Sequence, residues 1–193
     1  MRVCTQMLTI KSDNSICATD DITKFMIQMF AKMEKGYVVI KVHCHYGSDM
    51  KSATIRFADA PTIEYDDFNG GKSRISFRTG ITTTSCGAYT IDTSDRNGVD
   101  LYYRDKKVVS YELLRNTVIA QVDMKCRIDE ALLVAAIGFC SLMVNAMQHQ
   151  SVNVFLASVI GSVREDCRKW RNASGKERKS ISNKYSTKGV AEQ

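Results

Sequence analysis

The chain contains thirty-three consecutive residues without a charged side chain, from Ala131 to Val163. The first half, Ala131–Val144, is apolar on every side at helical spacing, and such a helix must be enclosed by protein or by lipid. A membrane span needs about 20 apolar residues, whereas the candidate span Ala131–Met147 is short and includes Ser141 and Asn145. We therefore expect a buried core helix followed by a second helix, with a membrane span as the alternative.

Two other stretches predict helices. Apolar side chains recur at helical spacing over Ile22–Lys35, directly after Thr19-Asp20-Asp21. Short oxygen-bearing side chains accept the free N–H groups of a first helical turn, and Gly36 is typical of the residue that ends a helix. We expect one helix over Ile22–Lys35 and another over about Val152–Arg171.

The rest of the chain alternates apolar and polar residues with period two, which is the pattern of strands with one buried face. In the clearest case, one side of the strand carries Val38, Ile40, Val42 and Cys44, and the other carries Lys41, His43 and His45. Ile81–Ser85 fits either a loop or an edge strand. The expected strands are Val3–Ile10, Tyr37–Cys44, Ala53–Phe57, Thr62–Tyr65, Arg74–Arg78, Tyr89–Ile91, Val99–Tyr103, Val108–Leu114 and Val118–Cys126.

These elements predict an α+β fold in which an antiparallel sheet is covered by two main helices, with a further C-terminal helix. The chain has 193 residues, enough for one domain with a real hydrophobic core. We expect this domain to span residues 1–171. Residues 172–193 hold few apolar side chains and many Lys, Ser and Asn, which favours a disordered basic tail.

Cysteine usage and the N-terminal sequence both favour an intracellular protein, in the cytoplasm or the nucleus. The seven cysteines are an odd number without C-x-x-C spacing, which is typical of a reducing compartment. Met1–Ile10 also lacks the charged-then-apolar pattern of a secretory signal.

The net charge of +6 is concentrated at the C-terminal end. Residues 164–193 hold nine basic and four acidic side chains, or +5, whereas the preceding 163 residues hold eighteen and seventeen, or +1. A nearly neutral body with a cationic end indicates a phosphate-rich partner, either nucleic acid or anionic lipid. A tail that serves only solubility is the alternative.

The candidate binding residues are the cations of this end and its tryptophan. An aromatic side chain between two basic residues suits a membrane interface or stacking on bases. A second candidate is a basic sheet face at the polar strand positions Lys41, Arg56, Arg74 and Arg78, for which solvated surface is the alternative. The membrane- or phosphate-binding set comprises Arg164, Arg168, Lys169, Trp170, Arg171, Lys176, Arg178 and Lys179.

No sequence motif identifies an enzymatic reaction. Gly71-Lys72-Ser73 resembles the end of a phosphate loop, but a strand is expected after it, whereas such loops need a helix N-terminus. His43 and His45 share a strand face but lack two further ligands for a tetrahedral metal site. A histidine-activated Cys86 has no third group to orient it. We therefore expect a non-enzymatic protein without metal or cofactor.

The order of the expected elements resembles rhabdovirus-type matrix proteins. The resemblance lies in VCTQMLTIKSDNSICATDDITKFMIQMF and TVIAQVDMKCRIDEALLVAAIGFCSLM, and the pattern covers Val3–Trp170. It implies a non-enzymatic viral structural protein of the virion and the host cytoplasm. Such a protein self-associates as a homo-oligomer and bridges an RNA–protein nucleocapsid to an anionic membrane, to which it binds peripherally.

A competing resemblance is to tubby-like and scramblase-like barrels, in which strands surround a C-terminal apolar helix. The run Ile128–Ala136, IDEALLVAA, is similar to the start of that helix. This resemblance implies an intracellular lipid-binding module. A basic accessory protein that binds nucleic acid is a further alternative, suggested by the charge distribution alone.

Overall fold

Two antiparallel sheets and three helices make up the described part of the chain, so the predicted α+β class is confirmed. The computed structural model describes residues 2–7, 9–10, 16–20, 25–58, 60–67, 70–77, 81–84, 88–114, 117–123, 127–149 and 154–186. One sheet has the order β1-β13-β12-β11-β10-β9 and the other has the order β2-β3-β4-β5-β6-β7-β8.

The strands of the first sheet are β1 (Arg2–Met7), β9 (Ile81–Thr83), β10 (Tyr89–Asp92), β11 (Gly98–Tyr103), β12 (Lys106–Leu114) and β13 (Thr117–Val122). Those of the second are β2 (Thr9–Ile10), β3 (Ile16–Asp20), β4 (Phe25–Glu34), β5 (Tyr37–Tyr46), β6 (Asp49–Phe57), β7 (Pro61–Asp66) and β8 (Lys72–Ser76). The period-two pattern therefore located most strands correctly, and Ile81–Thr83 is the edge strand that the sequence left open.

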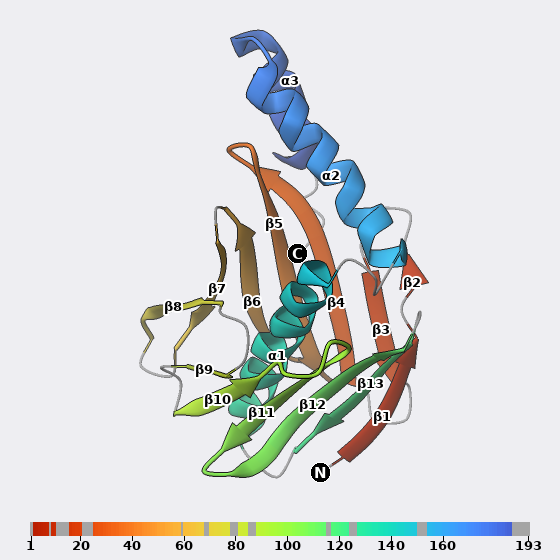
Figure 1. Cartoon of the computed structure of the whole chain (residues 1–193), viewed down its shortest axis with the longest axis vertical. Coiled ribbons are helices and arrows are strands. Elements are labelled where there is room, and N and C mark those ends of the chain that lie inside the picture. The colour runs from red at the N-terminus through yellow and green to blue at the C-terminus, as the bar shows by residue number, and fades with distance from the viewer. Residues whose placement is uncertain are drawn as a thin grey trace.

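The apolar helix α1 (Ile128–Gln148) lies between the two sheets (Figure 1). It contacts β5, β6 and β7 on one side and β11 and β12 on the other. Every residue from Ala131 to Ala146 is buried, which confirms the prediction that protein encloses this helix. Among the described residues, α1 is the helix long and apolar enough to cross a membrane, and 89% of that stretch is buried within the protein.

Polar contacts fix the position of α1 between the sheets. The side-chain amide of Asn145 donates to the backbone carbonyls of Asp95 and Gly98 at 2.7 and 3.1 Å. The Tyr111 hydroxyl donates to the Ala135 carbonyl at 3.0 Å. At Gly138, an added Cβ would lie 3.0 Å from the Tyr111 ring, so the absence of a side chain lets the helix approach β11 and β12 closely.

The helix predicted over Ile22–Lys35 is wrong, because Phe25–Glu34 forms strand β4. Ten residues of β4 pair with β5, and the two strands are joined by Lys35 and Gly36 with φ of 49° and 81°. A two-residue turn with positive φ at both positions is the preferred connection of a tight β-hairpin. Gly36 therefore serves a strand turn, not a helix end.

The other two helices do not lie between the two sheets (Figure 1). Helix α2 (Val154–Asn172) packs on β4 and β5, where its described apolar residues Ile160, Val163 and Cys167 are buried. The helix predicted over about Val152–Arg171 is thus present, whereas the predicted cover of one sheet by two main helices is wrong, because the segment of one of them contains strand β4. Helix α3 (Gly175–Ser186) corrects the predicted disordered tail over those residues, and residues 187–193 lie outside the described part.

We expect Asn145→Ala to destabilise the fold by about 1–3 kcal/mol, because it leaves buried backbone carbonyls without their donor. Urea unfolding followed by circular dichroism measures the loss. The exposed Asn172→Ala variant serves as the control, with a change within about 0.5 kcal/mol. Equal stability of the two variants would contradict the anchoring of α1 by Asn145.

Candidate functional site

Helices α2 and α3 form an antiparallel helical hairpin that contains most of the predicted binding residues. The Tyr185 hydroxyl donates to Asp166 at 2.7 Å, and Trp170 Nε1 donates to the Ser182 hydroxyl at 3.1 Å. Residue 166 of α2 thus contacts residue 185 of α3, and residue 170 contacts residue 182, so the two helices are antiparallel. We call residues 164–186 the C-terminal hairpin.

Trp170 fastens the C-terminal hairpin to the β-sheet. A Cβ placed on Gly36 would lie 2.7 Å from the Trp170 ring, so the indole packs directly on the turn between β4 and β5. Arg178 of α3 also contacts the indole. Its guanidinium lies 4.8 Å from the centre of the ring and donates to the carbonyls of Trp170 and Arg171. The tryptophan predicted as a membrane or base anchor is thus engaged by contacts within the protein.

Helix α3 begins with a capping box that the sequence analysis missed. The carboxylate of Glu177 accepts from the Ser174 backbone N–H at 2.9 Å and lies 3.0 Å from the Ser174 hydroxyl. These hydrogen bonds hold the pKa of the Glu177 carboxyl below its usual value. Ser174-Gly175-Lys176-Glu177 fits the S-x-x-E pattern of a helix start, and it was the signal that could have located α3.

The acidic side chains of the C-terminal hairpin are all bonded within it. Glu165 accepts two hydrogen bonds from Arg168 at 2.8 and 2.9 Å, which lower the pKa of the Glu165 carboxyl. Asp166 accepts from Tyr185, and Glu177 caps α3. These three carboxylates face eight basic side chains, namely Arg164, Arg168, Lys169, Arg171, Lys176, Arg178, Lys179 and Lys184.

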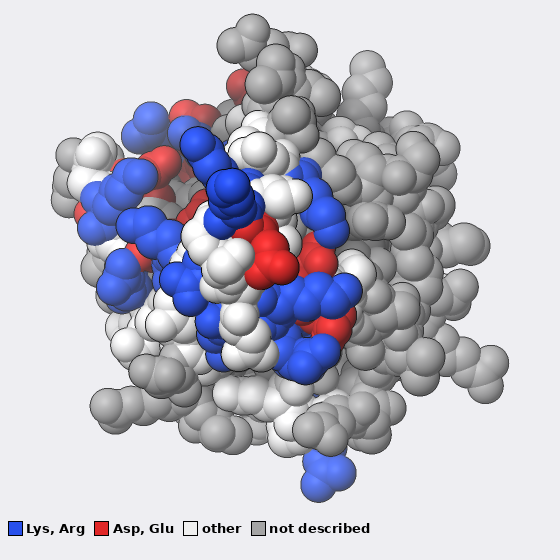
Figure 2. Space-filling view, turned by 90° about the horizontal axis from the view of Figure 1, so that it is seen from above, with Lys and Arg blue, Asp and Glu red and all other residues white. Residues whose placement is uncertain are grey.

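Some of these basic side chains remain available to an external anion. Among the described residues, Arg164, Lys176 and Lys179 are exposed and form no ion pair. Lys35 in the turn between β4 and β5 is exposed at the same end of the molecule. Figure 2 looks onto this end and shows that Lys and Arg cover more of its described part than the Asp and Glu that lie among them. The face is therefore positively charged.

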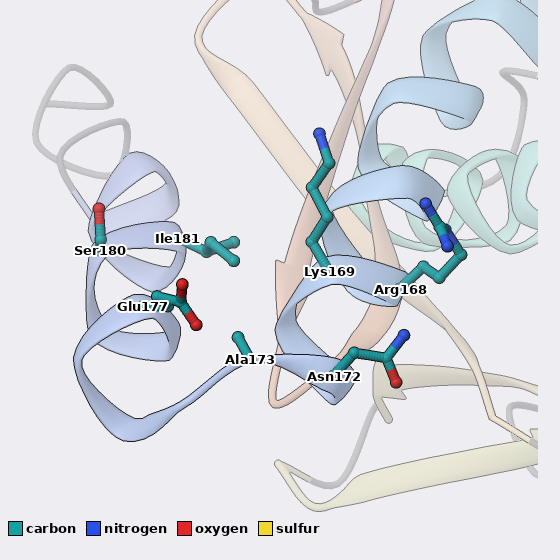
Figure 3. A pocket seen from close by; sticks show the side chains of 7 residues that line it. All are labelled: Arg168, Lys169, Asn172, Ala173, Glu177, Ser180 and Ile181. Atoms are coloured by element: carbon teal, nitrogen blue, oxygen red, sulfur yellow. The ribbon is translucent and has the colours of Figure 1, made fainter.

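A groove of about 480 Å³ separates α2 from α3 near their connection (Figure 3). Arg168 and Lys169 lie on its α2 side, and Glu177 and Ile181 lie on its α3 side. Its lining mixes cations, a carboxylate and apolar atoms, and it lacks the convergent donors of a dedicated anion pocket. The groove contributes to the charged face without forming a separate catalytic cleft.

In the second candidate, the basic sheet face, two of the four predicted residues are paired with acids. Arg56 Nη2 lies 3.1 Å from the Glu34 carboxylate, and Arg74 pairs with Glu64. Lys41 lies on the same outer face in the middle of β5 and is half-buried. Arg78 lies outside the described residues. Two of the four predicted cations of this face, Arg56 and Arg74, are therefore paired with neighbouring carboxylates.

The histidines considered as metal ligands make contacts with neighbouring side chains of the sheet. His43 packs edge-on against Phe30 with ring centres 5.4 Å apart, and His45 lies 3.1 Å from the Gln28 amide oxygen. No group of three metal-ligating side chains occurs within the described ranges. Gly71-Lys72-Ser73 leads into strand β8, as expected, and Cys86 lies outside the described residues.

Comparison with known proteins identifies no relative. No protein-family model, no curated protein sequence and no solved structure matches the chain.

We expect Gly36→Ala to destabilise the protein more than Gly47→Ala. Both glycines have positive φ, of 81° and 60°, so alanine is strained at either turn. Only the Cβ at position 36 would meet the Trp170 ring, since nothing lies within 4 Å of one at position 47. The excess loss should be about 1–3 kcal/mol in urea unfolding. Equal losses would contradict the packing of Trp170 on this turn.

We expect the C-terminal hairpin to loosen in acid. Because its folded-state pKa is lowered, Glu177 stabilises α3 fully above the ordinary carboxyl pKa of about 4.3, and this contribution is lost as pH falls through the lowered value. Trp170 is the single tryptophan, so its fluorescence reports the change. Glu177→Gln retains an acceptor without titrating and should show a smaller change between pH 6 and pH 3, about the range of the carboxyl groups. Identical curves would contradict the role of the capping box.

Proposed function

We propose that the protein is a non-enzymatic binding module that attaches peripherally to anionic membrane surfaces through its C-terminal hairpin. One observation carries this proposal. The hairpin's three carboxylates are bonded internally, while no acidic group among the described residues pairs with the exposed Arg164, Lys176 and Lys179. A basic side chain near an anionic bilayer contributes about 1 kcal/mol to binding.

The arrangement of the hairpin favours a membrane over nucleic acid. Proteins that bind single-stranded nucleic acid stack bases on aromatic side chains, but the Trp170 ring packs between Gly36 and Arg178. The C-terminal hairpin, which carries these cations, lies at one end of the molecule, and this position suits attachment to a flat, charged surface (Figure 1). A basic nucleic-acid-binding protein remains the second candidate, since the same charges also attract phosphates of RNA or DNA.

The two family resemblances bear differently on this proposal. The matrix resemblance included a helix after the first strand, where the chain forms β3 and β4. The barrel resemblance rests on strands around an apolar helix, and α1 between two sheets supports it. Both imply a membrane partner. Nucleocapsid contact and self-association rest on the matrix resemblance alone.

We expect the full chain to float with phosphatidylserine-containing vesicles at low salt and to dissociate at high salt, because screening weakens exposed charge interactions. The double variant Lys176→Glu/Lys179→Glu should bind at least about ten-fold more weakly, since two favourable contacts become repulsive. Flotation with neutral phosphatidylcholine vesicles should be absent.

Lys51→Glu/Arg104→Glu is the matched control, with the same charge change. Lys51 lies 3.7 Å from Asp129 at the start of α1, and Arg104 is in the turn between β11 and β12, at the end away from the hairpin (Figure 1). This variant should keep most of the binding. Equal loss in both variants would mean that net charge, not the hairpin, drives attachment. Binding that persists at high salt would mean that apolar insertion drives it.

A further inference from the structure

Ser180 differs from the other hydroxyl residues that hold the C-terminal hairpin together. Ser182 accepts the Trp170 hydrogen bond, and the Ser174 hydroxyl lies 3.0 Å from Glu177. Ser180 is exposed on α3, on the rim of the open groove between α2 and α3 (Figure 3). A modifying enzyme can therefore reach this oxygen without breaking a contact of Ser180 itself.

The residues around Ser180 have the pattern that basophilic protein kinases select. Lys176, Arg178 and Lys179 precede the serine at four, two and one positions, and the apolar Ile181 follows it. Kinases of this class bind such cations with acidic side chains and discriminate substrates by charge pattern. Three of the four residues before Ser180 are therefore basic, the exception being the acidic Glu177, and the residue after it is apolar.

Kinases bind their substrates in extended form, so α3 must open at least locally. None of its residues is fully buried, and partly exposed contacts of Arg178, Ser182 and Tyr185 attach it to α2. Segments with few buried contacts open at much lower free energy than the whole fold. Opening also releases Arg178 from the Trp170 ring, which completes the basic recognition sequence.

We propose that Ser180 is a phosphorylation site for a basophilic serine/threonine kinase and that its phosphate weakens attachment of the C-terminal hairpin to anionic surfaces. In this reaction the Ser180 Oγ attacks the γ-phosphorus of ATP, and the bond from that phosphorus to the bridging oxygen breaks. ADP leaves with that oxygen, and the hydroxyl proton passes to the catalytic base of the kinase.

The effect on attachment follows from the position of Ser180 on α3. Lys176 lies four residues before it and Lys184 four residues after it, and residues four apart on a helix are neighbours on one face. A phosphate carries about −1.5 to −2 charges at pH 7 and would pair with both lysines. One of the cations proposed to contact the membrane, Lys176, would then be neutralised within the protein, and the phosphate itself would be repelled by anionic lipid. This second part rests on the proposed function.

The site is tested by incubating the full chain with the catalytic domain of protein kinase C and Mg·ATP, followed by mass spectrometry of peptides. We expect a single major phosphate on Ser180 and its loss in Ser180→Ala. Ser182→Ala should be phosphorylated faster, because removing the Trp170 acceptor eases the opening of α3. Modification mainly at another serine, or no modification of the intact or the Ser182→Ala chain, would overturn the site.

The switch is tested by floating the purified phosphoprotein with phosphatidylserine vesicles. We expect binding about ten-fold to thirty-fold weaker than that of the unmodified chain, since nearly two charges are cancelled. Equal binding of both forms would overturn the switch and leave the site standing. If the unmodified chain does not float, the proposed membrane function and the switch fail together, whereas phosphate on Ser180 would still support the site.

Discussion

The fold depends on the enclosure of one apolar helix by two sheets. Sixteen consecutive residues of α1, from Ala131 to Ala146, are buried, and each fully buried large aliphatic or aromatic side chain contributes about 1.5–3 kcal/mol. An apolar helix of this kind has no polar face to present to water, so strands must cover it on every side. Gly138 allows the close approach of the sheet, and Asn145 fixes the register of the helix end. Because α1 carries no charged side chain between Ala131 and Ala146, the charged residues available for binding lie on other elements, at the surface of the molecule.

The sequence predicted the parts of the fold that local periodicity determines. The enclosed helix and most strands of the middle of the chain followed from their apolar patterns. The segment Ile22–Lys35 did not, because Phe25, Met29 and Met33 satisfy both helical spacing and strand alternation. Its ten-residue pairing with β5 decides between them, and that pairing is a tertiary contact that periodicity in β4 alone does not reveal.

The sequence identified the basic residues of the candidate site, but not the surface that they form in the folded protein. The basic residues near the C-terminus were recognisable from composition, whereas their pairing depends on which helix faces meet. The contact of Trp170 with Gly36 joins residues far apart in the sequence, so no local pattern could show that the indole is engaged. The capping box at Ser174 and Glu177 was readable, and it changes the interpretation of the tail from a mobile segment to an ordered hairpin with an exposed Ser180.

Hydrogen–deuterium exchange with and without phosphatidylserine vesicles reports on the enclosed helix and on the C-terminal hairpin in one measurement. We expect amides of residues 131–146 to exchange slowest and not to respond to vesicles, while residues 164–186 gain protection. Rapid exchange in α1, or a vesicle-dependent change confined to it, would contradict the enclosure of the helix by the two sheets and the assignment of attachment to the hairpin.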